Sequence, residues 1–168
     1  IDPFYLTWKA RAHGEQTRFI ELAGDVVTAM PKRVVEHVAE ALSTARGKAV
    51  NGARILVVGL AYKKNVDDMR ESPSLHVIRM LRERGAMVDY FDPHIPVAPT
   101  MAEHPEVAGM TSVAWSPAAL AAYDCAVVCT DHDAVDYAAL AQAVPLIVDT
   151  RNATARLKGA FADRIWKA

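Results

Sequence analysis

The sequence predicts an α/β fold in which a parallel sheet is flanked by helices and preceded by one long helix that Pro31 should kink. Three observations predict it. Short apolar runs rich in β-branched residues recur after residue 52, helical patterns separate these runs, and one apolar seam runs along residues 17–42. Parallel strands need crossover connections, so this alternation indicates a parallel sheet. We therefore expect a helical connector over residues 1–46 and a sheet domain over residues 53–168.

The first part of the chain is predicted to be helical. Residues 3–13 follow Asp2, a suitable N-cap, and Pro3 takes the first helical position. A longer helix starts at Thr17, and Pro31 should kink it because proline lacks the N–H that a helix interior requires. Its apolar positions recur at helical spacing and comprise Phe19, Leu22, Ala23, Val26, Val27, Met30, Val34, Val38, Ala41 and Leu42.

That apolar seam is longer than a small sheet domain easily covers. It can pack on a preceding domain, on the same helix of a second copy, or within the chain's own core as an ordinary helix. We expect the second arrangement, a homodimer in solution that forms through the long helix.

The rest of the chain alternates between strand and helix patterns. Predicted strands cover residues 55–58, 87–91, 125–130 and 146–149, with helices over 72–84 and 116–122 and another starting near Asp136. Residues 93–111, which contain several prolines, read as a loop with at most a short helix. The tail after residue 152 has no decisive period.

A charged loop follows the first predicted strand. Gly59 ends the strand, and Ser72-Pro73 supplies an N-cap and first residue for the next helix. Between them lie Lys63, Lys64 and Arg70, mixed with Asp67 and Asp68. Cations and a helix N-terminus at the carboxyl edge of a sheet suit an anion such as phosphate. The alternative is a loop whose charges are merely solvated.

A dinucleotide-binding fingerprint does not fit this loop. Counting from Gly59, the second and third glycine positions hold Ala61 and Lys64. Asp92 stands where a ribose-binding acid would follow the next strand, but we interpret it as a strand-ending turn. A free-standing NAD-binding domain is therefore disfavoured, and a phosphate here would be held by side-chain cations rather than by a glycine cradle.

Tyr62-Lys63 and Arg151 lie far apart in the sequence, yet the parallel sheet should bring them to one edge. Together they suit a diphosphate ester, because lysine supplies a point charge, arginine a bidentate donor and tyrosine a flat surface. His132, in the loop after the strand at 125–130, could touch a ligand or transfer a proton. The interpretation we favour is a polar loop that caps the helix near Asp136.

Composition excludes several classes of protein. The 168 residues are 52% hydrophobic and 23% charged, with a net charge of −1, so no general field attracts nucleic acid or an anionic membrane. No apolar run could span a bilayer, and we expect a cytoplasmic protein. Cys125 and Cys129 lie about 13 Å apart along one strand, too far for a disulfide, and are expected to be core thiols. The scattered histidines predict no metal site.

Two segments resemble a known family. Gly59-Leu-Ala-Tyr-Lys-Lys-Asn-Val-Asp-Asp-Met-Arg-Glu-Ser-Pro73 resembles the signature of the C-terminal domain of the UDP-glucose/GDP-mannose dehydrogenase family. Ile1-Asp-Pro-Phe-Tyr-Leu-Thr-Trp-Lys-Ala10 resembles the segment after that family's catalytic cysteine, in the form seen in UDP-N-acetylhexosamine 6-dehydrogenases. The resemblance extends to about Asn152 and implies a Rossmann-like UDP-sugar-binding domain behind a dimerising central helix.

The resemblance also implies roles for individual residues. Tyr62 and Lys63 match the pair that contacts the nucleotide-sugar, and Arg151, within Asp-x-Arg-Asn, matches another substrate contact. Arg70 matches an arginine that reaches NAD bound mainly on an N-terminal domain. Asp2 matches an aspartate near the family's catalytic cysteine that is thought to help activate water.

For the intact enzyme, the resemblance implies a double oxidation at C6 of a UDP-sugar, with NAD as the oxidant. Because the chain starts with Ile inside a longer motif, we expect a fragment without the nucleophile or the NAD loop, which binds UDP weakly and oxidises nothing alone. Two alternatives stay open. The parent enzyme can be a UDP-glucose 6-dehydrogenase, or the chain can be a dimerising interaction module that binds no small molecule.

Overall fold

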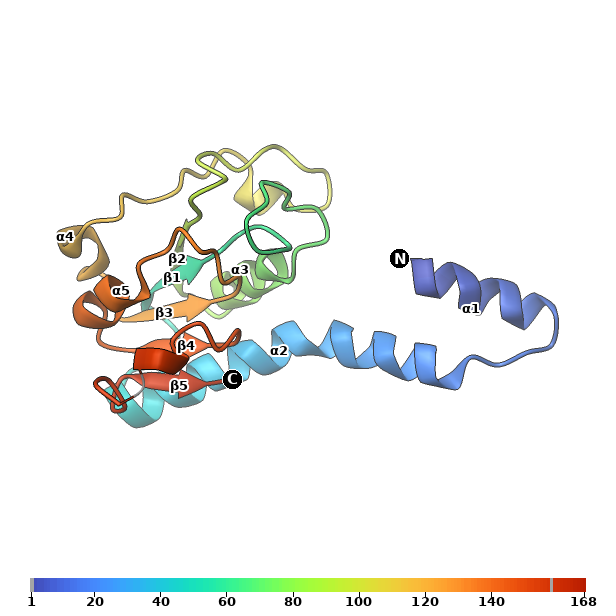
Figure 1. The fold of residues 1–168 in the computed structure, drawn as a ribbon, viewed down its shortest axis with the longest axis horizontal. Coiled ribbons are helices and arrows are strands. Elements are labelled where there is room, and N and C mark those ends of the chain that lie inside the picture. The colour runs from blue at the N-terminus through green and yellow to red at the C-terminus, as the bar shows by residue number, and fades with distance from the viewer. Residues whose placement is uncertain (1, 158) are drawn as a thin grey trace.

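A five-stranded, wholly parallel sheet forms the centre of the molecule (Figure 1). The computed structural model describes residues 2–157 and 159–168, without the side chain of Asp2. The strands are β1 (Arg54–Val58), β2 (Met87–Phe91), β3 (Cys125–Val128), β4 (Ile147–Asp149) and β5 (Ile165–Lys167), and their order in the sheet is β2-β1-β3-β4-β5. The predicted α/β fold with a Rossmann-like parallel sheet is confirmed.

Helices cover both faces of the sheet. They are α1 (Asp2–Ala12), α2 (Arg18–Arg46), α3 (Pro73–Glu83), α4 (Pro117–Leu120) and α5 (Tyr137–Ala143), with 3₁₀ turns at Pro105–Val107 and Ala155–Leu157. The second half of α2 packs with α3 on one face, whereas α4 and α5 pack on the other. Both faces of the sheet are therefore buried.

Strand β1 shows how the sequence pattern produces this layering. Ile55 and Val57 face the core beneath α2 and α3, while Leu56 and Val58 face the core beneath α4 and α5. Successive side chains of a strand point to opposite faces, so a strand covered on both sides must be apolar at every position. This requirement explains the unbroken apolar run from which the strand was predicted.

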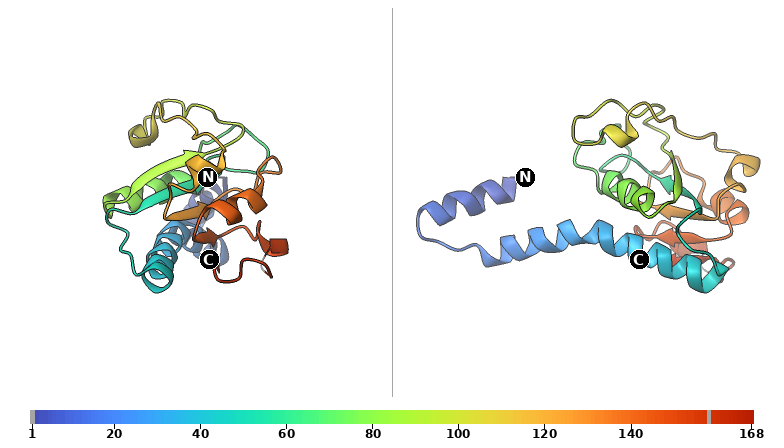
Figure 2. Two further views of the ribbon diagram at one scale, coloured as in Figure 1. Left: turned by 90° about the vertical axis from the view of Figure 1, so that its left-hand side faces the viewer. Right: turned by 180° about the vertical axis from the view of Figure 1, so that it is seen from behind.

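Helix α2 divides into two parts with different surroundings. After Pro31 its apolar residues Val34, Val35, Val38, Ala41 and Leu42 are buried in the core. Before Pro31 the same seam is exposed, and this half of α2 projects from the α/β unit together with α1 (Figures 1 and 2). The helix continues through Pro31 without a break and ends at Gly47, which adopts the left-handed conformation of a C-cap. Only half of the predicted seam therefore belongs to the core.

The predicted N-caps of α3, α4 and α5 are confirmed. Ser72, Ser116 and Asp136 each accept a backbone N–H from the first turn of α3, α4 and α5, respectively. Helix α4 ends at Leu120, before the predicted Ala122, and β3 ends at Val128, before the predicted Thr130. The N–H groups of Cys129 and Thr130 both donate to Val58, so the regular ladder stops where the chain after β3 turns against β1.

The tail forms a strand that the sequence analysis missed. Ile165 and Trp166 pair with Ile147 and Val148, which adds β5 to the edge of the sheet beside β4. Three residues are too few to establish an alternating pattern, so this strand depends on the tertiary pairing.

Two further predictions concern the core and the membrane. Both cysteines are free thiols, as predicted, and burial raises the pKa of Cys129 to about 12. Among the described residues, no helix combines the length and the apolar character that crossing a membrane requires.

Candidate functional site

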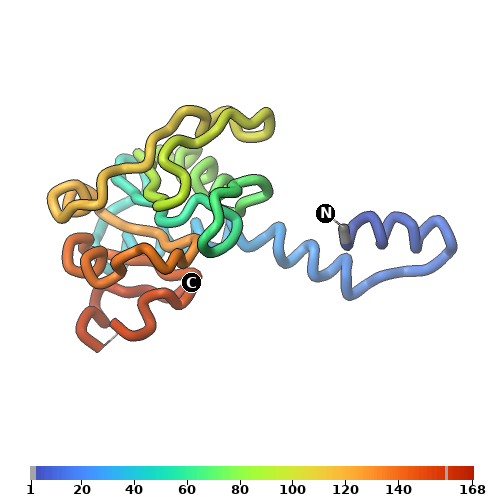
Figure 3. The backbone as a smooth tube through the Cα atoms, turned by 45° about the horizontal axis from the view of Figure 1, so that its top comes forward, coloured from blue at the N-terminus to red at the C-terminus, as the bar shows by residue number. Residues whose placement is uncertain are grey.

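The predicted site residues come from loops at the carboxyl edge of the sheet. Strands β1, β3 and β4 are neighbours, so the loops that follow them are neighbours as well. The tilted view in Figure 3 shows the segment after β1 beside the segment after β3, and the side chain of Asn65 bonds to Asp133 across them at 2.6 Å. Open parallel sheets bind their ligands along this edge.

The loop after β1 depends on glycine at position 59. The φ angle of Gly59 is +88°, and a Cβ placed there would lie 2.6 Å from the Cβ of Thr130. The turn is therefore pressed against the chain that leaves β3. Thr130 completes the contact when its hydroxyl donates to the carbonyl of Ala61 at 2.6 Å.

Asp92, at the end of β2, is a hydrogen-bond centre for this edge. Its buried carboxylate accepts the N–H groups of Leu60 and Ala61 at 2.7 and 3.0 Å, as well as those of His94 and Ile95 at 2.8 and 3.2 Å. The predicted strand-ending turn is thus present, but the carboxylate also captures the first amides of the loop after β1.

The N-terminus of α3 is closed in the same manner. Ser72 and Ser74 are both 1% exposed, and the hydroxyl of Ser74 donates to the carbonyl of Gly59 at 2.9 Å. The expected phosphate site at this helix end is therefore not open. Since the amides of Leu60 and Ala61 and the helix end are used within the protein, the side-chain cations are the main candidates to hold an anion at this edge, which agrees with the failed glycine fingerprint.

Tyr62 and Lys63 are both exposed on this loop. The Tyr62 side chain is 41% exposed, and the ammonium of Lys63 lies 5.1 Å from the centre of its ring, within cation–π range. The backbone of the pair is held from one side, because the N–H of Tyr62 donates to the carbonyl of Asp68 at 2.9 Å. A flat ring and a cation thus lie together, open to a ligand.

Arg151 contacts Asp131 in the loop after β3, a carboxylate that sequence reasoning did not single out. Its Nε lies 3.3 Å from one oxygen of Asp131, and the ammonium of Lys64 lies 4.0 Å from the other. Lys64 also pairs with Asp133 at 2.6 Å, and this bond raises the pKa of Lys64. The structure thus links Arg151 to Lys64, whereas Lys63 lies over Tyr62. The sequence alone could not show that Lys64 shares Asp131 with Arg151 while Lys63 lies over the Tyr62 ring.

The backbone around Arg151 is fixed by Asp149, the last residue of β4. The carboxylate of Asp149 accepts the N–H groups of Arg151 and Ala153 at 3.0 and 3.2 Å, and both the N–H and the hydroxyl of Thr154 at 2.9 and 2.5 Å. Burial disfavours the charged form, but the hydrogen bonds from Thr154 and Arg151 outweigh it and lower the pKa of Asp149. The arginine therefore extends from a firmly anchored turn.

Positive φ angles mark both loops. Among the described residues, those other than glycine with positive φ are Asn65, Glu71 and Asn152, at 60°, 59° and 61°. Asn65 and Glu71 belong to the loop after β1, and Asn152 follows Arg151. Sparsely populated backbone conformations concentrate at functional sites, so this distribution favours a binding role for the edge.

Arg70 lies farther along the loop after β1. Its guanidinium donates to Asp68 at 2.6 Å, and these bonds lower the pKa of Asp68 to about 2. Both residues line a hollow of about 450 Å³ together with Pro99 and Met101. Asp2 lies in α1 on the projecting part, and its side chain is outside the described residues. The structure thus brings Tyr62, Lys63 and Arg151 to one edge, but it does not bring Asp2 there.

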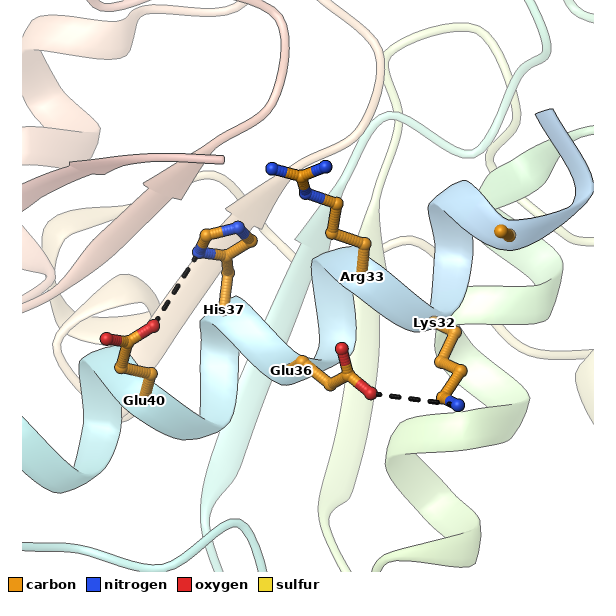
Figure 4. Close-up of a pocket in the computed structure, with 6 residues that line it drawn as sticks. Lys32, Arg33, Glu36, His37 and Glu40 are labelled. Carbon is orange, nitrogen blue, oxygen red and sulfur yellow. Dashed lines mark ion pairs between the residues drawn. The ribbon is translucent and has the colours of Figure 1, made fainter. Parts of the chain in front are cut away.

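A second hollow, also of about 450 Å³, follows α2 rather than the sheet edge (Figure 4). Lys32 pairs with Glu36 and His37 with Glu40, each at 3.9 Å, and Arg33 extends to the same side as His37. One helix supplies all of the lining, and most of its charges are paired on the surface, so this hollow contains none of the predicted site residues. In the part of the chain that the structure describes, no three His, Cys, Asp or Glu side chains gather as a metal centre requires.

Comparison with known proteins identifies the family. The model of the UDP binding domain of the UDP-glucose/GDP-mannose dehydrogenase family matches residues 56–156, which run from β1 beyond the Arg151 turn. This chain belongs to the UDP-glucose/GDP-mannose dehydrogenase family. The match includes both loops of the candidate site and all of the sheet except β5 and the start of β1.

Individual members of the family are similar over most of the chain. A UDP-N-acetyl-D-mannosamine dehydrogenase of Methanococcus maripaludis is 36% identical over 134 residues, which cover 80% of this chain and 27% of that protein. A UDP-glucose 6-dehydrogenase of Haloferax volcanii is 32% identical over 155 residues, or 89% of this chain and 33% of that protein. The chain thus spans roughly a third or less of these relatives.

A solved structure of the family has the same fold. The UDP-D-ManNAc dehydrogenase of Pyrococcus horikoshii superposes with a TM-score of 0.65 at 26% sequence identity, covering 83% of this chain and 31% of that one. The predicted relationship to UDP-sugar dehydrogenases is confirmed, and the similar proteins include enzymes named for UDP-N-acetylmannosamine and for UDP-glucose.

Proposed function

We propose that this chain is the UDP-sugar-binding part of an NAD-dependent UDP-sugar 6-dehydrogenase that oxidises a UDP-N-acetylhexosamine to its uronic acid in two steps. The UDP binding domain of the family and the relatives named for UDP-N-acetyl-D-mannosamine support this substrate class. A UDP-glucose substrate is the second candidate, because the Haloferax volcanii relative covers 89% of the chain.

One observation carries the proposal. The loop with Tyr62 and Lys63 and the turn with Arg151 meet at one sheet edge, where Asp92 already accepts the first two amides of the loop, those of Leu60 and Ala61. A ligand at that edge must supply negative charge to side-chain cations and a surface for the Tyr62 ring. A uridine diphosphate supplies both.

Each side chain then has a defined task. Lys63 neutralises one phosphate as a point charge, and Arg151 can donate two parallel hydrogen bonds to the other. Tyr62 offers its ring to an apolar part of the nucleotide-sugar. The bond of Arg151 to Asp131 uses only Nε, so the two terminal nitrogens of Arg151 can donate to the ligand while that bond is kept. Lys64 shares that carboxylate and adds positive charge at the edge.

The residues present do not form an NAD cradle. The amides of Leu60 and Ala61 bind Asp92, and the space beside Gly59 is filled by Thr130. We therefore propose that NAD, which accepts hydride in this chemistry, binds mainly to a domain outside this chain, with Arg70 reaching toward it. Asp2 is proposed to act near the nucleophilic cysteine of the same outside region.

Calorimetric titration of the chain with UDP tests the proposal. We expect weak, saturable binding by the wild type and a loss of about tenfold to hundredfold in affinity for Lys63→Glu, because a charge-assisted contact becomes a repulsion. Lys9→Glu is the matched control, since it makes the same charge change on α1. A wild-type chain that does not bind UDP would support the alternative of a dimerising interaction module, and equal affinities of the two variants would exclude the assigned role of Lys63.

A further inference from the structure

The loop that carries Tyr62 and Lys63 is held by its two flanks. On the amino side, Asp92 accepts the N–H groups of Leu60 and Ala61. On the carboxyl side, the N–H of Asn65 donates to Nδ1 of His132 at 2.9 Å. The two candidate ligand contacts thus lie on a short segment between fixed points, so their placement depends on both attachments.

His132 joins these two flanks through a single imidazole. Its Nε2 lies 3.0 Å from Oδ2 of Asp92, the same oxygen that accepts from Leu60 and Ala61. A backbone N–H can only donate, so Nδ1 must carry a lone pair, and the ring proton must be on Nε2, where it donates to Asp92. His132 is therefore a neutral Nε2–H tautomer that connects the chain after β3 to the loops after β1 and β2.

The surroundings of the imidazole leave it little freedom to move. His132 is 0% exposed, and the ring of His94 packs on it with centroids 4.9 Å apart. Tyr137 donates to the carbonyl of His132 at 3.3 Å and fixes its backbone. A ring enclosed in this way cannot reach a ligand, so its influence on binding must pass through its two hydrogen-bond partners, the N–H of Asn65 and the carboxylate of Asp92.

We propose that His132 is a positioning residue for nucleotide binding, which sets Tyr62 and Lys63 through its bond to the N–H of Asn65, whereas its bond to Asp92 mainly stabilises the fold. This inference rests on the proposed function. Neighbouring Asp131 contacts Arg151, so one short segment after β3 serves both halves of the candidate site.

Two substitutions separate the two bonds. In His132→Asn, the side-chain oxygen takes the place of Nδ1 and can still accept from Asn65, but the shorter side chain does not reach Asp92. In His132→Gln, the amide nitrogen takes the place of Nε2 and can still donate to Asp92, but the acceptor for Asn65 is lost.

UDP titrations and thermal melts of both variants test the inference. We expect His132→Asn to melt at the lower temperature yet keep its UDP affinity within about twofold of the wild type, while His132→Gln weakens binding about tenfold. A merely structural role would make affinity follow the melting temperature. Equal losses, no losses or the reverse order would overturn the inference.

Amide hydrogen exchange provides a readout that needs no ligand. The Asn65 amide should exchange faster in His132→Gln than in the wild type and in His132→Asn, and nitrogen chemical shifts should show the Nε2–H tautomer. Tyr137→Phe, which removes a neighbouring bond without altering the imidazole, should leave exchange at Asn65 unchanged. If the wild type fails to bind UDP, the proposed function fails, while exchange at Asn65 still decides whether His132 positions the loop.

Discussion

At the scale of single residues, buried carboxylates organise the edge of this sheet. Asp92 collects the amides after β1 and β2, and Asp149 collects those around Arg151. A buried carboxylate that accepts several backbone N–H groups fixes the turns that donate them. The exposed cations therefore extend from turns that these two side chains hold in place.

The pKa shift of Asp149 predicts a pH-dependent contribution to stability. Its folded pKa lies below the ordinary value of 3.8, so its contribution is complete above that value and is lost as the pH falls through the folded pKa. Asp149→Asn should lower the free energy of unfolding at neutral pH by about 2 kcal/mol. The difference from the wild type should shrink below about pH 4.

Urea denaturation at several pH values measures this difference. Asp163→Asn is the matched control, because the Asp163 side chain is 81% exposed, and its substitution should leave the free energy of unfolding nearly unchanged. A difference between wild type and Asp149→Asn that stays constant from neutral to acidic pH would contradict the assigned source of stability.

At the scale of elements, the first half of α2 leaves a row of large apolar side chains exposed to solvent. Phe19, Leu22, Val26, Val27 and Met30 are 89%, 59%, 53%, 66% and 41% exposed, respectively. The exposed side chains of α1, among them Tyr5 and Trp8, enlarge the apolar surface of this projecting part. Apolar surface of this extent on one helical arm indicates an interface.

We propose that a second copy of the chain covers this half of α2. Light scattering at micromolar concentration should then give the mass of a dimer, and Leu22→Asp combined with Val26→Asp should give that of a monomer, because charges would be buried in the interface. Asp25→Ala, on the same helical turn, should leave the dimer intact. A monomeric mass for the wild type would contradict the proposal and would mean that something other than a second copy covers this surface.

The elements could largely be predicted from local signals, but their partners could not. Caps such as Ser72 and Asp136 act within one turn, so the sequence locates α3 and α5. Strand β5 is too short for a pattern, and the burial of α2 changes at Pro31 for reasons of tertiary packing. The candidate site followed the same division. Tyr62, Lys63 and Arg151 were predicted from residue type, position and family resemblance, whereas the proposed role of His132 required knowledge of which amide its ring accepts.

At the scale of the whole molecule, the chain separates into a ligand-binding sheet and a projecting helical arm (Figure 1). The predicted boundary between residues 1–46 and 53–168 stays a prediction, since the second half of α2 shares the core of the sheet. The relatives extend well beyond this chain, which spans 27% of one and 33% of another. We therefore expect binding here and oxidation only in a longer protein.

Mixing the chain with NAD and a UDP-N-acetylhexosamine should produce no NADH, and titration with NAD alone should show no binding. The reason is local, because the amides of Leu60 and Ala61 that would meet a pyrophosphate are bound to Asp92. A full-length dehydrogenase of the family that reduces NAD serves as the positive control for the absorbance assay. Accumulation of NADH with the chain alone would refute the expectation that this chain binds the substrate but does not oxidise it.

Strand β5 has a practical consequence for work with this protein. The ammonium of Lys167, in this strand, lies 3.3 Å from the carboxylate of Asp149 and also donates to the side chain of Asn152. Residues of β5 therefore stabilise the turn that contains Arg151. A purification tag fused after Ala168 would therefore disturb the surroundings of the candidate substrate arginine. A tag placed ahead of α1 would be attached to the projecting arm instead and would leave the sheet edge accessible.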